Sequence, residues 1–208
     1  MWAWMTENSR ALTVVTSTGT LLVWVVYLQL IVSGFRRQRR STILINRGAG
    51  RGLGAHCLIS NMSADAIYLT SIIATITTAE RSYHRALTDL RDLDEAMQGD
   101  PRSIFKQGPL QSGEYLDIGT FGDLIRQIGE QEDGDIPSGD WTSQVRSFEL
   151  TAVAVYGADD FLVGARRTFL LRADDKGRIE ICPTSVGSAQ IRSRRERRAI
   201  GEMLRDYL

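Results

Sequence analysis

The residues of this chain that could do chemistry are concentrated in one stretch rich in arginine and glycine. Arginine binds phosphate groups of nucleic acids or lipids, because its guanidinium fork matches phosphate oxygens. The segment Gly50–Ala55 fits the pattern G-x-G-x-x-A of phosphate-binding loops, and His56 and Cys57 are metal-ligand types. The stretch from Arg36 to Arg51 contains no acid, and its six arginines are Arg36, Arg37, Arg39, Arg40, Arg47 and Arg51.

The glycine pattern lacks the surroundings that a nucleotide site requires. A dinucleotide site needs a helix directly after the loop, so that the pyrophosphate meets the helix N-terminus. The residues that follow, HCLISN, favour a strand, and no G-K-[ST] is present for a P-loop. We therefore expect a flexible hairpin loop between two strands.

No arrangement of residues indicates catalysis or a resident metal. Neighbours along a strand point to opposite faces, so His56 and Cys57 do not easily share a metal. Ser185 and Ser188 have no base nearby in the sequence, and the acidic segment 130–140 lacks the spacing of a calcium loop. We expect no catalytic residue, no cofactor and no metal, and we expect Cys57 and Cys182 to be free buried thiols rather than a disulfide.

An uncharged segment of membrane-spanning length precedes the arginines. Residues 11–35 contain no charged side chain, and about 20 apolar residues cross a bilayer. A signal peptide would carry its positive charge before the apolar stretch, whereas here it follows. The positive-inside rule places residues 1–10 outside and the rest in the cytoplasm. The preference for arginine over lysine is typical of a GC-rich bacterial genome. We therefore expect the membrane to be a bacterial inner membrane.

One face of the expected spanning helix carries hydroxyl and aromatic side chains, which are typical of a helix that packs against another helix. The alternatives are a lone anchor, whose hydroxyls bond back to their own backbone, and a water-lined pore, which lacks the usual ring of charges. The face consists of Thr13, Thr16, Ser17, Thr20, Trp24 and Tyr27.

Short β-branched segments alternate with turn residues through the rest of the chain. After the basic juxtamembrane segment 36–41, this pattern predicts seven or eight strands within residues 42–192. We expect a β-sandwich, immunoglobulin-like, with one or two short helices. Residues 81–98 fit either a strand or a helix. Arg166 and Arg167 lie mid-strand, so one faces inward and requires a carboxylate partner if buried.

The tail, residues 193–208, is expected to form an amphipathic basic helix. Ser193 and Glu196 have the spacing of a capping box. Four arginines crowd the first turns, where cations oppose the helix dipole, so we expect an anionic lipid or partner contact. These residues are Arg194, Arg195, Arg197 and Arg198.

The chain as a whole is expected to be a single-pass membrane protein without catalytic activity. Its formal net charge of zero gives no general attraction to nucleic acid, and no small-molecule substrate is indicated. We expect an accessory or scaffolding subunit that docks on another membrane protein through its helix and presents the β-domain for protein interaction. The alternative is a self-oligomerising effector or channel with a ligand-sensing β-domain. In both cases Arg36, Arg37, Arg39 and Arg40 would contact anionic lipid and fix the topology.

Overall fold

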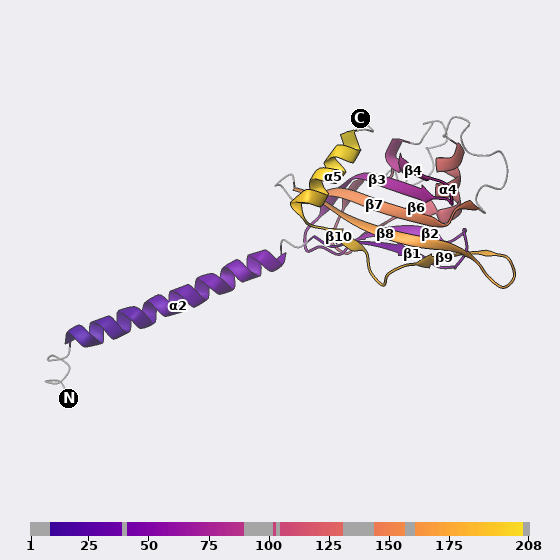
Figure 1. Ribbon diagram of the computed structural model, residues 1–208. Helices are drawn as coiled ribbons and strands as arrows, with labels where there is room; N and C mark the ends of the chain where they lie inside the picture. The colour runs from indigo at the N-terminus through magenta and orange to yellow at the C-terminus, as the bar shows by residue number, and fades with distance from the viewer. Residues whose placement is uncertain are drawn as a thin grey trace. The chain divides into compact units, whose positions relative to one another are not determined.

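The computed structural model describes residues 9–38, 41–89, 102, 105–130, 144–156 and 161–205 (Figure 1). The chain divides into two compact units, Met1–Arg40 and Ser41–Leu208. The first contains helix α2, Ser9–Gln38, of 30 residues. Its segment Ser9–Gly34 has a mean hydropathy of 1.8 and is long and apolar enough to cross a membrane. The most apolar part of this segment is not buried within the chain, so its side chains have no protein core to pack in.

The second unit contains a small antiparallel sheet in the order β1-β2-β6. Its strands are β1 (Ile43–Arg47), β2 (His56–Asn61) and β6 (Tyr115–Thr120). Alternate residues are buried along each strand, as the period of two in a half-buried sheet requires. Ile45, Cys57 and Ile59 face the core, while His56 and Tyr115 are exposed.

A larger antiparallel sheet of seven strands forms the rest of the β-domain. Its central order is β10-β8-β7-β3-β4, with β5 also paired to β3 and β9 also paired to β8. The strands are β3 (Ile67–Thr77), β4 (Ser82–Ala86), β5 (Gly108–Leu110), β7 (Ser147–Tyr156), β8 (Phe161–Ala173), β9 (Ile179–Pro183) and β10 (Ala189–Ile191). The expectation of an apolar N-terminal helix followed by a mainly-β domain is thus confirmed.

One hydrophobic core joins the two sheets and the short helix α4, Phe121–Glu130. Phe121 packs edge to face against Phe148 and Phe169, with ring centroids 5.7 and 4.8 Å apart. Thr120 caps the helix, because its Oγ1 accepts a hydrogen bond from the Asp123 N–H.

The outer edge of β1 is bonded to side chains from the other sheet. The Gln190 amide accepts from Ile43 N–H at 3.0 Å and donates to Ile43 O at 2.7 Å. Ser188 Oγ accepts from Ile45 N–H at 2.7 Å. These side chains satisfy backbone groups that an edge strand would otherwise expose. The first strand of the β-domain is therefore fastened on both sides.

Arg167 is the inward-facing member of the arginine pair. The expectation that it pairs with a carboxylate is wrong. Its guanidinium donates instead to neutral oxygens of two segments, namely Ile45 O, Asn46 Oδ1, Ser185 O and Val186 O. Several carbonyl dipoles replace one ion pair, so the charge is solvated by the protein. Arg167 thereby holds β1 against the segment before β10.

The described residues contain ten strands between Ile43 and Ile191, more than the seven or eight predicted. The ambiguous region from residue 81 forms strand β4 and then a 3₁₀ turn, Leu87–Asp89. Residues 90–98 and the acidic segment 131–140 lie outside the described residues. The pattern did not predict strand β10. The glycine loop leads into strand β2, as expected, and not into a helix.

The C-terminal helix α5, Arg194–Arg205, packs on the face of the larger sheet that points away from the main core. Ile200 and Leu204 form a second apolar cluster with Val153, Leu162 and Ile191. Figure 1 shows α5 and α4 at opposite ends of the β-domain. Glycine is required at position 164 in β8, because a Cβ there would lie 2.9 Å from Ala152 O.

Candidate binding sites on the helix and the β-domain

The polar face of α2 satisfies several of its own hydroxyl groups. Thr13 Oγ1 donates to Ser9 O at 2.8 Å, Thr16 Oγ1 to Thr13 O at 3.1 Å and Thr20 Oγ1 to Thr16 O at 2.8 Å. Back-bonded threonines are compatible with a lipid environment or with a packed helix. Their hydroxyls therefore do not by themselves require a partner.

Two aromatic side chains continue the same helix face. Trp24 and Tyr27 pack edge to face, with ring centroids 6.1 Å apart and an interplanar angle of 87°. Both rings are more than half exposed. They form a rigid apolar step on the surface of α2, suited to contact with a neighbouring helix or with acyl chains.

The predicted topogenic arginines lie at the end of α2 and just beyond it. Arg36 and Arg37 are in the last turns of the helix, whereas Arg39 and Arg40 lie outside the described residues. Positive residues directly after an apolar helix agree with the positive-inside pattern.

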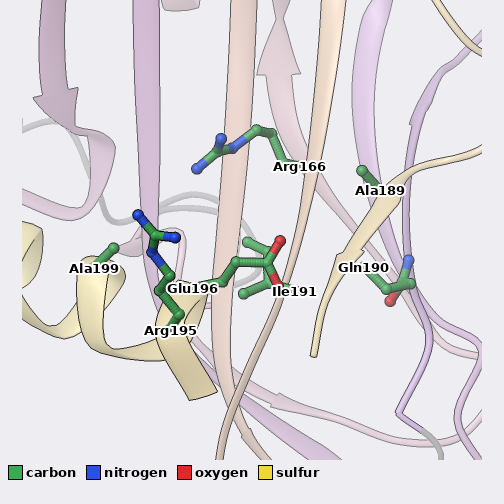
Figure 2. A pocket seen from close by; sticks show the side chains of 7 residues that line it. All are labelled: Arg166, Ala189, Gln190, Ile191, Arg195, Glu196 and Ala199. Carbon is green, nitrogen blue, oxygen red and sulfur yellow. The ribbon is translucent and has the colours of Figure 1, made fainter. Parts of the chain in front are cut away.

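A pocket of about 280 Å³ lies between β8, β10 and the start of α5. Arg166 enters it from β8 and Arg195 from α5 (Figure 2). Figure 2 shows the two guanidinium groups on one side of the pocket and the Gln190 side chain on the other. The remaining lining residues are Ala189, Ile191, Glu196 and Ala199. The pocket thus combines cationic groups with an apolar floor.

The carboxylates near this pocket already have partners. Glu149 Oε1 lies 3.3 Å from Arg166 Nε, and its Oε2 accepts from Thr168 Oγ1 at 2.8 Å. Glu196 Oε2 accepts from Ser193 Oγ at 2.7 Å and from Ser193 N–H at 3.1 Å. These two hydrogen bonds hold the pKa of Glu196 below its usual value. The capping box expected from the sequence is confirmed.

The arginines at the start of α5 have different surroundings. Arg195 and Arg198 are exposed, Arg197 is partly buried, and Arg194 is the first residue of the helix. Within the described part of the chain, Arg195 and Arg198 form no hydrogen bond or ion pair with a side chain. Their charges are therefore available to an external anion.

The other residue types considered for chemistry are separated by the fold. His56 Nδ1 lies 2.7 Å from Asp117 Oδ2 on the exposed face of the small sheet. Cys57 points into the core, where burial raises the pKa of its thiol. Both cysteines are free, as expected, although Cys182 is only partly buried. Among the described residues no three His, Cys, Asp or Glu side chains form a metal-sized group.

Comparison with known proteins gives no relative for this chain. No protein-family model, curated protein or solved structure matches it.

One residue of the pocket between β8, β10 and α5, Arg195, was among the anion contacts expected from the sequence. Arg195 was expected to meet an anion because of its place near a helix N-terminus. Arg166 was noted only as one of two adjacent strand arginines, and Gln190 was missed. Both join the pocket through the antiparallel pairing of β10 with β8, in which Gln190 lies opposite Ala165. No local signal in the sequence predicts that pairing.

Proposed function

We propose that this chain is a membrane-anchored accessory or scaffolding subunit without catalytic activity. Helix α2 docks on another membrane protein through the face that contains Thr16, Thr20, Trp24 and Tyr27. The β-domain, which we class as an immunoglobulin-like sandwich, presents a binding surface in the cytoplasm of a bacterial cell. The observation that carries the proposal is the apolar 26-residue segment Ser9–Gly34 of α2, whose most apolar part is not buried within the chain.

The exposure of α2 supports the membrane anchor. Side chains such as Val15, Leu22, Val23 and Leu30 are each more than 60% exposed, and burial of one large apolar side chain is worth about 1.5–3 kcal/mol. A helix of this length that lacks a protein core is stable in water only at a large cost. A bilayer removes that cost, and α2 at about 45 Å is longer than its hydrocarbon core.

The order of charges supports the orientation. The residues before the apolar segment carry only Glu7 and Arg10, while four arginines follow it between positions 36 and 40. Positive residues are retained on the cytoplasmic side during insertion. The β-domain would then lie in the cytoplasm, where free thiols such as Cys57 and Cys182 persist.

The docking face is supported by its composition and by the aromatic pair. The β-hydroxyl residues Thr16 and Thr20 are smaller than leucine, so a partner helix can approach their side of α2 closely. The Trp24–Tyr27 pair adds a fixed apolar surface on the same side. A second copy of the chain is the alternative occupant, and it would make the protein a self-assembling effector.

The test replaces two threonines of the docking face by the bulkier and more apolar leucine. We expect Thr16→Leu combined with Thr20→Leu to reduce co-purification of the membrane partner in mild detergent by about fivefold or more, as expected for the loss of roughly 1 kcal/mol of helix packing. The control, Val15→Leu with Val26→Leu, adds similar bulk to the opposite face and should retain the partner.

Two outcomes would contradict the docking proposal. In one, the Thr16/Thr20 variant and the control retain the partner equally. In the other, wild-type protein purified in the same detergent is a homo-oligomer with no second membrane protein, which would favour the self-assembling effector.

A further inference from the structure

We infer that the pocket between β8, β10 and α5 binds the phosphate group of an anionic lipid headgroup. The inference rests on the membrane anchor of the proposed function, but it does not depend on docking by α2. The groups that would contact the phosphate are the guanidiniums of Arg166 and Arg195, because the amide of Gln190 is already bonded to Ile43 and Ser188.

The pocket lies close to the first residue of the first strand of the β-domain. Gln190 lines the pocket and is hydrogen-bonded in both directions to Ile43, the first residue of β1. The pocket therefore adjoins the point at which the chain enters the β-domain. Eight residues separate Ile43 from Gly34, the end of the apolar segment. Even a fully extended chain of this length reaches only about 30 Å, so headgroups are within reach of this part of the domain.

Hydrogen bonds within the chain use the two guanidinium groups of the pocket only in part. Arg166 uses its Nε towards Glu149 and Thr151, each at 3.3 Å. Its two terminal nitrogens form no hydrogen bond among the described residues, although its charge interacts with Glu196, and the Arg195 side chain forms no hydrogen bond within that part of the chain. Arginine binds phosphate through pairs of parallel N–H groups. Two such forks on one side of a pocket suit a single phosphate.

The carboxylates near the pocket are bonded to other side chains. Glu196 lines the pocket, but its Oε2 is bonded to Ser193. Glu149 is shared between Arg166 and Thr168. Both carboxylates thus accept hydrogen bonds from hydroxyl groups of the chain, whereas the Arg195 guanidinium forms no hydrogen bond among the described residues. An anion in the pocket would therefore meet donors that the chain itself does not use.

The apolar lining of the pocket favours a lipid over a simple ion. Ala189, Ile191 and Ala199 provide apolar surface beside the arginines. A volume of about 280 Å³ exceeds that needed for one phosphate and leaves room for a glycerol group. An inorganic anion would leave this apolar surface in contact with water, whereas a headgroup would cover part of it.

The experiment measures lipid binding to the full chain. Wild-type protein in mild detergent is titrated with dioleoylphosphatidylglycerol or dioleoylphosphatidylcholine, and the bound lipid is counted by native mass spectrometry. We expect a clear preference for phosphatidylglycerol. Arg166→Gln with Arg195→Gln should weaken its tightest binding by roughly 30-fold, since each arginine is worth about 1 kcal/mol at an anionic lipid surface.

Matched variants separate this pocket from a general charge effect. Arg126→Gln with Arg172→Gln removes two exposed arginines elsewhere on the β-domain, and it should leave the affinity unchanged. Arg166→Lys with Arg195→Lys keeps the charge and should restore a large part of the binding. Circular dichroism and urea unfolding of each variant verify that the β-domain is folded.

Three results would overturn the inference. They are an equal loss in the Arg126/Arg172 control, no preference between the two lipids in the wild type, and displacement of phosphatidylglycerol by an equal concentration of inorganic phosphate. The last result would assign the pocket to a free anion. The Thr16/Thr20 variant of α2 should bind phosphatidylglycerol normally, so failure of helix docking and failure of lipid binding are distinguishable.

Discussion

Cys57 and Arg167 show how single residues in this β-domain respond to burial. Cys57 is fully buried, and burial raises the pKa of its thiol because a thiolate would lose its hydration. Arg167 stays cationic in the core because backbone carbonyls surround its guanidinium. The thiol thus avoids a buried charge, whereas the guanidinium is stabilised by local dipoles.

The raised pKa of Cys57 predicts a loss of stability at alkaline pH. An unfolded thiol ionises near pH 8.5, whereas the folded thiol keeps its proton well above that pH. Below about pH 8.5 both states are protonated, so the full stability is present. Above it, the unfolded state releases a proton that the folded state retains, and the free energy of unfolding falls by up to about 1.4 kcal/mol per pH unit.

Urea unfolding of the full chain between pH 7.5 and 10 measures this dependence. Cys57→Ala should remove the Cys57 part of the slope. If wild type and Cys57→Ala lost stability in parallel as the pH rises, the thiol would not be responsible.

At the scale of elements, strand β8 has paired strands on both of its sides. It pairs with β7 along its length and with β9 and β10 on its other side. Its inward face carries Arg167 and Phe169, and its outward face carries Gly164 and Arg166. The same strand therefore contributes to the core, to the α5 contact and to the pocket.

The close packing at Gly164 predicts a specific cost for a methyl group. A Cβ at this position would lie 2.9 Å from Ala152 O and 3.3 Å from Ile191 Cδ1. Because the nearest atom belongs to a paired strand, it cannot move away cheaply. We expect Gly164→Ala to lower the free energy of unfolding by about 1–3 kcal/mol, measured by urea denaturation.

A second glycine provides the control for this substitution. A Cβ at Gly187 would meet no atom within 4 Å, so Gly187→Ala should change the stability by less than about 0.5 kcal/mol. Equal effects of the two substitutions would mean that the contact between β8 and its neighbours is not tight.

The sequence predicted most elements because their signals are local. Alternating burial marks long strands such as β3 and β7, and Thr120 marks the start of α4. Strand β10 has only three residues, too few for a period of two to stand out from chance. Its conformation is imposed by β8. The same non-local pairing brings Gln190 to Arg166, which is why the pocket was only partly foreseen.

The neutral partners of Arg167 were not predictable for a related reason. A buried arginine needs acceptors, and charge considerations point first to a carboxylate. Which carbonyl oxygens converge on a guanidinium depends on how β1 and the segment 185–188 meet, across more than 120 residues of sequence. Sequence reasoning identified the need for acceptors but not the atoms.

At the scale of the whole molecule, the distribution of charge predicts the topology of insertion. We expect replacement of Arg36, Arg37, Arg39 and Arg40 by glutamine to leave roughly a tenth or more of the molecules with the β-domain on the opposite side, because the retention signal is lost. Fusion of reporters active only inside or outside the cell to the C-terminus measures this fraction.

The matched control removes four exposed arginines of the β-domain, which are Arg126, Arg146, Arg172 and Arg178. These residues lie far from the apolar segment in sequence, so the control should insert as the wild type does. Equal inversion in both variants would show that total charge, and not its position, sets the topology.

The double fastening of β1 also determines how the protein responds to force. Tension applied to the chain before β1 enters the β-domain at Ile43. On one side β1 is held by its backbone ladder to β2, and on the other by Gln190, Ser188 and Arg167. A pull along the strand loads both rows at the same time, so neither can open bond by bond from its end. The attachment point is therefore a mechanically resistant part of the domain.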